Sequence, residues 1–146
     1  MQQEWVKYNL LNTLVPTFFC VQETKLKRPN QIRTKSSKNY NFYELHRKSS
    51  SGGGLCIGVH KDIKSIWIYQ GDDEVECLIV EFWLNDFPFR IMTAYGPQLG
   101  DMKERKKSKF WQFIEKEADL VNKIGAVFIL QMDGNCHLGN ISLRMI

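Results

Sequence analysis

The apolar residues of the chain recur at two spacings, one typical of helices and one typical of strands. Near the N-terminus Val6, Leu10 and Leu14 recur every four residues, and this spacing predicts a first helix. Pro16 would end that helix because proline cannot continue it. A second, amphipathic helix is predicted from Phe110, Phe113, Ile114, Ala118 and Val121. Gly125 would close this second helix.

Outside the helices, short apolar runs rich in aromatic and β-branched residues predict strands. These runs cover residues 17–21, 40–45, 55–59, 62–69, 75–84, 87–95 and 126–130. Asn85 and Asp86 form a short polar join between two long runs, which is a hairpin signature. No internal repeat or linker interrupts the pattern. We therefore predict a single α/β domain over residues 1–146, with a sheet connected largely by hairpins.

Length and composition allow one hydrophobic core and no more, since the chain has 146 residues and 43% hydrophobic content. No apolar run approaches the roughly 18 residues of a membrane span, and the first residues lack the pattern of a secretory signal. The four cysteines show no metal-ligand spacing, and Cys20, Cys56 and Cys77 fall within predicted strands. We expect buried reduced thiols and an intracellular protein without a membrane partner.

The formal net charge of +4 is unevenly distributed. Residues 24–48 contain eight Lys or Arg residues and only one acid, Glu44. Such a segment favours a polyanionic partner, because each phosphate contact by Lys or Arg releases a counterion. The alternative is a solvated loop without a partner. A second basic run at residues 103–109 is interpreted as the hydrated first turns of the second helix.

Two predicted strands lead into residues that can bind a cation. Asp133 and Asn135 are expected just past the end of the buried strand at 126–130, where open α/β sheets receive ligands. Glu23 follows the strand at 17–21. We expect strand ends in one sheet layer to bring these residues together. Two such acids could share Mg²⁺, which takes oxygen ligands and keeps several waters.

Four segments, in this order, resemble successive motifs of the endonuclease/exonuclease/phosphatase superfamily. They are Gln-Glu-Thr-Lys at residues 22–25, Gly-Gly-Gly-Leu-Cys-Ile-Gly-Val at 52–59, Thr-Ala-Tyr-Gly-Pro at 93–97 and Met-Asp-Gly-Asn-Cys-His-Leu-Gly at 132–139. They occur in order across nearly the whole chain, from residue 22 to residue 139. The combination most resembles the abasic-endonuclease-like domain that precedes the reverse transcriptase in non-LTR retrotransposons.

The resemblance implies a two-layer sandwich of mixed sheets flanked by helices, with the active site where the loops of the sheets meet. It makes Glu23 the metal-binding glutamate and Tyr95 the active-site tyrosine. It makes Asp133 and Asn135 the pair that acts on the nucleophilic water and the scissile phosphate. It also implies Mg²⁺, or Mn²⁺ in its place, as the cofactor. The implied partners are DNA and a downstream reverse transcriptase domain, and the implied location is the nucleus.

The chain also departs from the family pattern. Met132 precedes Asp133 where the family usually has glycine, and a glycine stands between Asp133 and Asn135 instead. The family's first strand, with an Asn at the metal site, has no counterpart here. A further Asp and a Ser-Asp-His motif are also missing. We therefore expect a partial domain, truncated at both ends and inactive alone.

Each candidate residue has a simpler interpretation. Glu23 could be a helix-initiating acid stabilised by the helix dipole. Tyr95 could be an aromatic residue at a strand end that packs on the following turn. Asp133 and Asn135 could be turn formers, a role that both residue types favour. His46 and His60 show no ligand spacing and are interpreted as structural.

Three functions remain open from the sequence. The first is a Mg²⁺-dependent DNA endonuclease domain of a retroelement. The second is a phosphoesterase of the same fold that acts on RNA, a lipid or an inositol phosphate. The third is a non-catalytic remnant that binds nucleic acid. The uneven basic charge favours nucleic acid over a small substrate.

Overall fold

The computed structural model describes residues 15–25, 38–46, 53–71, 75–96 and 104–133. In order along these segments, the elements are β1 (Phe18–Gln22), β2 (Tyr40–Leu45), β3 (Leu55–His60), β4 (Ser65–Gln70), β5 (Cys77–Leu84), β6 (Phe87–Tyr95), α2 (Glu104–Lys123) and β7 (Val127–Asp133). The predicted first helix and most of the basic segment at 24–48 lie outside the described residues.

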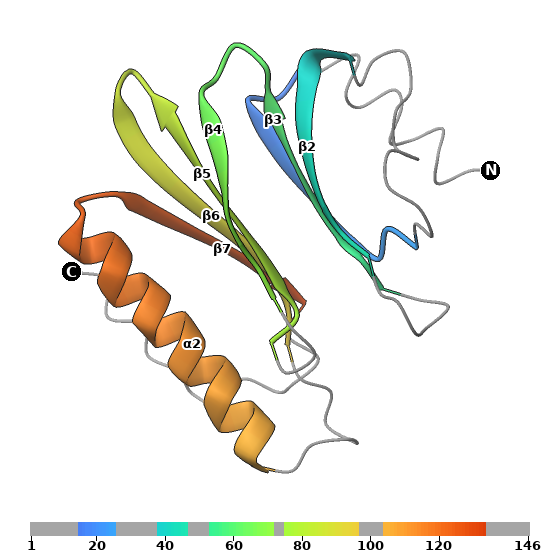
Figure 1. Cartoon of the computed structure of the whole chain (residues 1–146), viewed down its shortest axis with the longest axis vertical. Helices are drawn as coiled ribbons and strands as arrows, with labels where there is room; N and C mark the ends of the chain where they lie inside the picture. Colours follow the sequence, from blue (N-terminus) through green and yellow to red (C-terminus); the bar gives the residue numbers. More distant parts are fainter. Residues whose placement is uncertain (1–14, 26–37, 47–52, 72–74, 97–103, 134–146) are drawn as a thin grey trace.

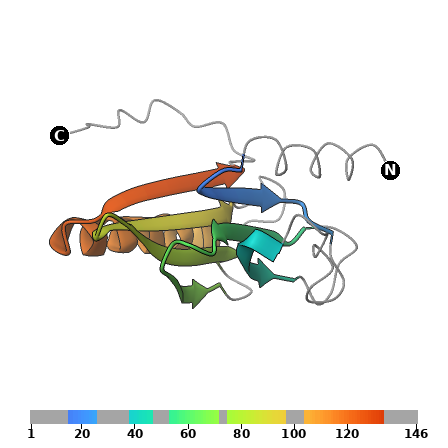
Figure 2. The ribbon, with the colours of Figure 1, turned by 90° about the horizontal axis from the view of Figure 1, so that it is seen from above.

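The elements form three layers, which are two sheets and one helix (Figure 1). The three-stranded sheet has the order β1-β3-β2, and the four-stranded sheet has the order β4-β5-β6-β7. Helix α2 covers the outer face of the four-stranded sheet. Seen from above, the edge strands β1 and β7 lie on one side of the sheets, and β2 and β4 lie on the other (Figure 2). The expected α/β fold with two sheets is confirmed.

The predicted hairpin at Asn85 and Asp86 joins β5 to β6. Leu84 pairs with Phe87, so the two residues between them form the whole turn. Both turn residues have positive φ, 50° for Asn85 and 65° for Asp86. A two-residue turn of this kind follows the twist of the flanking strands, and Asn and Asp tolerate the left-handed region better than other side chains do.

A helical crossover makes β6 and β7 parallel. Gly125, with φ 66°, follows the last turn of α2 and lets the chain reverse into β7, as its position in the sequence predicted. Tyr95 and Asp133 are register partners at the ends of the two strands. The crossover therefore brings two residues 38 positions apart to the same edge of one sheet.

Alternation along β6 builds two hydrophobic cores. Ile91 and Tyr95 face the core between the sheets, whereas Met92 and Ala94 face the core beneath α2. Along β7, Ile129 packs against the first core, and Phe128 and Met132 pack against the second. Residues of β6 and β7 that share the parity of Tyr95 therefore point toward the three-stranded sheet.

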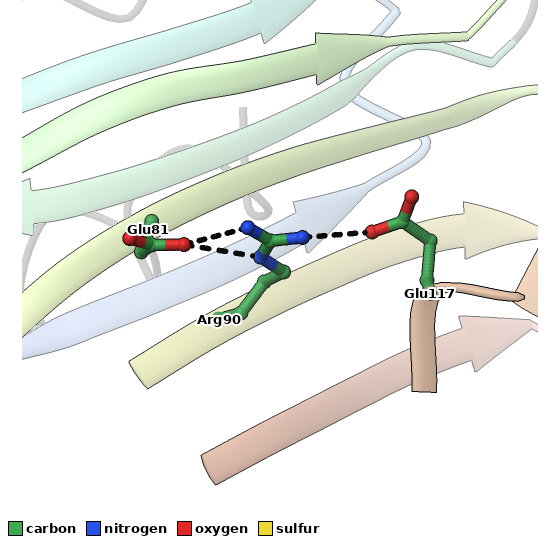
Figure 3. A network of polar contacts seen from close by, with 3 residues as sticks. All are labelled: Glu81, Arg90 and Glu117. Carbon is green, nitrogen blue, oxygen red and sulfur yellow. Dashed lines mark hydrogen bonds and ion pairs between the residues drawn. The ribbon is translucent and has the colours of Figure 1, made fainter. Parts of the chain in front are cut away.

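A buried ion network fastens α2 to the four-stranded sheet (Figure 3). Arg90 of β6 contacts one carboxylate oxygen of Glu81, on β5, through Nε at 3.1 Å and through a terminal nitrogen at 2.7 Å. Its other terminal nitrogen lies 3.1 Å from the carboxylate of Glu117 on α2. The Arg90 side chain is 8% exposed. The guanidinium therefore bridges two strands and the helix at once.

Two predictions about β7 were wrong in detail. The strand does not stop before Asp133 but includes it as its last residue. Among the described strands it is also at the edge of its sheet rather than buried, and Val127 and Leu130 are exposed. Parallel pairing with β6 provides the main-chain hydrogen bonds that carry the strand through its polar residues.

The described cysteines agree with the sequence prediction. Cys20, Cys56 and Cys77 are free thiols; Cys56 and Cys77 are buried and Cys20 is half-buried. Burial between the sheets raises the pKa of the Cys20 thiol to about 12. No helix in the described part of the chain is long and apolar enough to cross a membrane.

Candidate active site

Three strand ends meet at one edge of the fold. Glu23 directly follows β1, Tyr95 is the last residue of β6, and Asp133 is the last residue of β7. We call these three residues the candidate site. The end of β1 lies beside the end of β6, because the Gln22 side-chain amide donates to the Ala94 carbonyl oxygen at 2.9 Å. Figure 1 shows β1 and β7 ending on the same side of the molecule.

This arrangement differs from the expectation that strand ends of one sheet layer would form the site. Glu23 comes from the three-stranded sheet, and Tyr95 and Asp133 come from the four-stranded sheet. The candidate site therefore lies across the gap between the sheets. Asn135 lies outside the described residues, so the structure does not place it.

Glu23 is held against the two glycines that precede β3. Its φ is 54°, in the left-handed region, so Glu23 does not itself have helical backbone geometry. The N–H groups of Thr24 and Lys25 donate to the carbonyl oxygens of Gly54 and Gly53 at 3.2 and 2.8 Å. The Gly53 N–H in turn donates to the Glu23 carboxylate at 3.3 Å. The glycine run thus fixes both the main chain and the side chain of Glu23.

The phenol of Tyr95 contacts Glu23 directly. The Glu23 N–H donates to the Tyr95 hydroxyl oxygen at 2.5 Å, and Tyr95 is only 7% exposed. Burial, together with the nearby carboxylates of Glu23 and Glu76, raises the pKa of Tyr95 to about 12, although the hydrogen bond from the Glu23 N–H acts in the opposite direction. Tyr95 is therefore a neutral phenol at physiological pH, able to donate its proton in a hydrogen bond.

Asp133 presents an exposed carboxylate beside Tyr95. Its carbonyl oxygen accepts a hydrogen bond from the Gly96 N–H at 2.9 Å, which fixes the end of β7 against the end of β6. As the last residue of a strand, Asp133 is not a turn former within the described chain. Its parity places the side chain on the same face of the sheet as that of Tyr95.

Sequence reasoning missed a polar layer directly beneath the candidate site. The Gln22 amide approaches the Thr93 hydroxyl at 3.4 Å, and that hydroxyl donates to the Gln131 side-chain oxygen at 3.0 Å. We call Gln22, Thr93 and Gln131 the amide layer. Each member precedes a candidate-site residue by one or two positions. This short spacing, together with the positions of Gln22 and Thr93 as first residues of two motifs, was the signal available in the sequence.

Glu76 was also missed. Its carbonyl oxygen accepts a hydrogen bond from the Tyr95 N–H at 2.9 Å, and its carboxylate contributes to the raised pKa of the Tyr95 phenol. Glu76 lies just before β5, a position that we had assigned to the strand. An acid at the start of an otherwise apolar run was the available signal.

The candidate site fits a partly hydrated hard cation. Glu23 and Asp133 offer exposed carboxylate oxygens, the ligand type that Mg²⁺ prefers, and Mg²⁺ is commonly bound by one or two carboxylates and several waters. No group of three or more His, Cys, Asp or Glu side chains that could hold a metal ion occurs among the residues that the structure describes. Two carboxylates at one edge are the donor type that Mg²⁺ or Mn²⁺ takes together with water.

Comparison with solved structures identifies the fold. The chain matches truncated Caenorhabditis elegans TDP2 with a TM-score of 0.69 at 14% identity, covering 93% of this chain and 56% of that one. It matches the human Nocturnin catalytic domain, which has a bound sulfate anion, with a TM-score of 0.70 at 10% identity, covering 93% and 57%. An endonuclease/exonuclease/phosphatase family protein from Bacteroides thetaiotaomicron matches with a TM-score of 0.63 at 17% identity, covering 92% and 54%.

The chain therefore has the endonuclease/exonuclease/phosphatase fold, as its motifs predicted, and spans just over half the length of these matched structures. No family profile matches the sequence, and no curated protein matches it. The likeness shown is one of fold. A specific likeness to retrotransposon domains stays a prediction from the motifs.

Proposed function

We propose that this chain is part of a divalent-metal-dependent phosphodiesterase that acts on nucleic acid, and specifically of the DNA endonuclease domain of a retroelement. The observation that carries the proposal is the convergence of Glu23, Tyr95 and Asp133 across the gap between the two sheets. Phosphodiester hydrolysis needs a cation, an acceptor that orients water and neutral donors to the phosphate oxygens. At one edge, these three residues provide carboxylates that can bind the cation and orient water, and a neutral phenol.

Each residue has a role that follows from its surroundings. Glu23, held by its hydrogen bonds with Gly53 and Gly54, would bind Mg²⁺, which neutralises the charge that develops on the phosphate. Asp133 would accept a proton from the attacking water, and Asn135 would donate to a phosphate oxygen. Tyr95 would hold the main chain of Glu23 through its phenol oxygen and so fix the point from which the Glu23 side chain extends.

The nature of the substrate rests on charge and on fold neighbours. One matched structure is D. rerio TDP2 complexed with a single-strand DNA product, which supports a nucleic-acid substrate for the same fold. The excess of basic residues at 24–48 supports a polyanion. A second candidate is a phosphatase acting on a small phosphoester, because another matched structure is a mannosyl-6-phosphatase.

The retroelement assignment rests on the four motifs and their order. This assignment implies that the same polyprotein contains a reverse transcriptase domain and that the protein acts in the nucleus. The test is the genomic sequence directly downstream. An open reading frame that encodes a Ser-Asp-His motif and then a reverse transcriptase would support the assignment. Its absence in intact copies of the element would contradict it.

The metal site can be tested on the chain itself. We expect Glu23→Ala to bind Mn²⁺ more weakly than the unmodified chain does. Binding is measured as the loss of the free Mn²⁺ signal in electron paramagnetic resonance. The matched control is Glu115→Ala, which removes an exposed acid of α2 on the far side of the four-stranded sheet. Equal Mn²⁺ binding by the unmodified chain and Glu23→Ala would contradict the proposed function.

The substrate is tested by parallel binding and cleavage assays. We expect weak binding to duplex DNA that falls steeply with salt, little binding to inositol phosphates, and negligible plasmid nicking in Mg²⁺. Nicking should be negligible because Glu23 and Asp133 are the only acids that the described structure brings to the candidate site with exposed carboxylates, and fewer charged ligands bind Mg²⁺ more weakly. Nicking as fast as that of a full-length relative, abolished in Glu23→Ala, would show that these two carboxylates suffice for catalysis.

A further inference from the structure

The side chains between the two sheets change from apolar to polar to charged toward the candidate site. Deep in the gap, Phe18 and Cys20 of β1 pack against the core that contains Ile91. The next step is the amide layer of Gln22, Thr93 and Gln131. Glu23, Tyr95 and Asp133 follow at the edge. The amide layer thus separates the hydrophobic core from the charged residues.

The hydrogen bonds of the amide layer run in one direction across three strands. The Gln22 nitrogen donates to the Thr93 oxygen, and the Thr93 hydroxyl donates to the Gln131 oxygen. The same Gln22 nitrogen donates to the Ala94 carbonyl oxygen at 2.9 Å. Hydrogen bonds in such a chain polarise one another and so strengthen one another. Thr93 is fully buried, so a Thr93 hydroxyl without a hydrogen-bond partner would lower the stability of the fold.

We propose that Gln22, Thr93 and Gln131 are positioning residues that hold the ends of β1, β6 and β7 in a fixed arrangement, and so set how Glu23 and Asp133 present their carboxylates to a divalent cation. This inference rests on the proposed function. None of the three residues needs to touch the cation or the substrate. Their effect passes through the main chain, over one residue from Gln22 to Glu23 and two residues from Gln131 to Asp133.

The geometry favours this role over simple packing. The two sheets are joined near the candidate site by side-chain hydrogen bonds rather than by a shared strand ladder, since β1 pairs with β3 and β6 pairs with β5 and β7. An apolar contact between the sheets would tolerate sliding, whereas hydrogen bonds require defined distances and angles. The separation of the Glu23 and Asp133 carboxylates therefore depends on the amide layer.

The test compares Mn²⁺ binding by the full chain and its Thr93→Val, Thr93→Ser and Gln131→Met variants. Thr93→Val keeps the shape of the side chain and removes the hydroxyl; Thr93→Ser restores the hydroxyl. We expect Mn²⁺ affinity to fall by about 10-fold in Thr93→Val and in Gln131→Met, and to recover in Thr93→Ser. Met92→Leu, on the opposite face of β6, is the matched control and should bind as the unmodified chain does.

The outcomes separate this inference from the proposed function. Glu23-dependent Mn²⁺ binding that is unchanged in folded Thr93→Val and Gln131→Met would overturn the inference and leave the proposed function standing. Mn²⁺ binding that does not depend on Glu23 would overturn both. Circular dichroism and urea unfolding identify the folded variants. If Thr93→Val does not fold, Gln131→Met decides the question, because Gln131 is only half-buried.

Discussion

The main-chain N–H of Glu23 donates a hydrogen bond to the phenol oxygen of Tyr95, although 72 positions separate the two residues in the sequence. The bond joins the end of β1 in one sheet to the end of β6 in the other. A residue expected to act in catalysis is therefore also a structural link between the sheets.

Replacing Tyr95 with Phe should remove a pH dependence of stability. The tyrosine pKa rises from about 10 in the unfolded chain to about 12 in the folded one, so the folded state holds the proton more tightly. This contribution is fully present below about pH 10 and is lost as the pH rises toward 12. The difference in unfolding free energy between the unmodified chain and Tyr95→Phe should therefore shrink over that range.

Urea unfolding at a series of pH values measures this difference, and phenolate absorbance reports the ionisation directly. Other groups that titrate in the same range are common to both proteins and cancel in the comparison. A difference that stays constant up to pH 12 would contradict the raised pKa of Tyr95.

Gly54→Ala should destabilise the fold more than Gly125→Ala does. Both glycines have positive φ, 91° and 66°, so each substitution strains the main chain by about 1–2 kcal/mol. A Cβ at Gly54 would also lie 2.4 Å from the Thr24 hydroxyl oxygen, whereas one at Gly125 would have no atom within 4 Å. We expect about 1–3 kcal/mol of further loss for Gly54→Ala.

The measurement is the unfolding free energy of both variants under the same conditions. Gly125→Ala serves as the matched control because it shares the strain but lacks the close contact. Equal losses in the two variants would mean that the Thr24 side chain moves aside at little energetic cost.

Arg90→Met should lower the free energy of unfolding more than most single substitutions do. It leaves the carboxylates of Glu81 and Glu117, whose side chains are 12% and 14% exposed, without their shared cation. Breaking a buried ion pair in this way lowers the unfolding free energy by about 3–5 kcal/mol. Replacing all three residues, with Arg90→Met, Glu81→Leu and Glu117→Leu together, should recover much of that loss.

Urea unfolding of the single and triple variants provides the comparison. If the triple variant is no more stable than Arg90→Met, the network contributes through its specific geometry rather than by avoiding unpaired charges.

The sequence predicted elements whose causes are local. The β5–β6 turn depends on Asn85 and Asp86 alone, and the end of α2 depends on Gly125, so both could be predicted from a few neighbouring residues. The continuation of β7 through Gln131 to Asp133 could not, because its hydrogen bonds come from β6. Strand patterns also do not reveal which strands share a sheet.

The meeting of three motif residues at one edge was predictable from the sequence, but the use of two different sheets to bring them there was not. Motif resemblance singled out Glu23, Tyr95 and Asp133, and the structure brings them to one edge. Their roles stay predictions. The candidate site draws its residues from two sheets, and Thr93 contacts both Gln22 and Gln131. Both features depend on packing between segments far apart in the chain. No local pattern encodes such contacts.

The edge strand β7 should make this chain self-associate. Among the described strands it pairs only with β6, no described strand covers its other side, and Val127 and Leu130 are exposed. Long apolar edges of this kind pair readily with other chains, and charged residues, lysine above all, prevent such pairing. Leu130→Lys should therefore shift the chain toward the monomer in sedimentation velocity experiments.

Leu120→Lys is the matched control, because Leu120 is exposed to a similar extent, 42% against 38% for Leu130, but lies on α2 rather than on a strand edge. Association through strand pairing should respond to the change on β7 and not to the change on the helix. Non-specific hydrophobic association would instead be reduced by both substitutions. A chain that stays monomeric at high concentration, without binding a hydrophobic dye, would show that the free edge of β7 is protected within this chain.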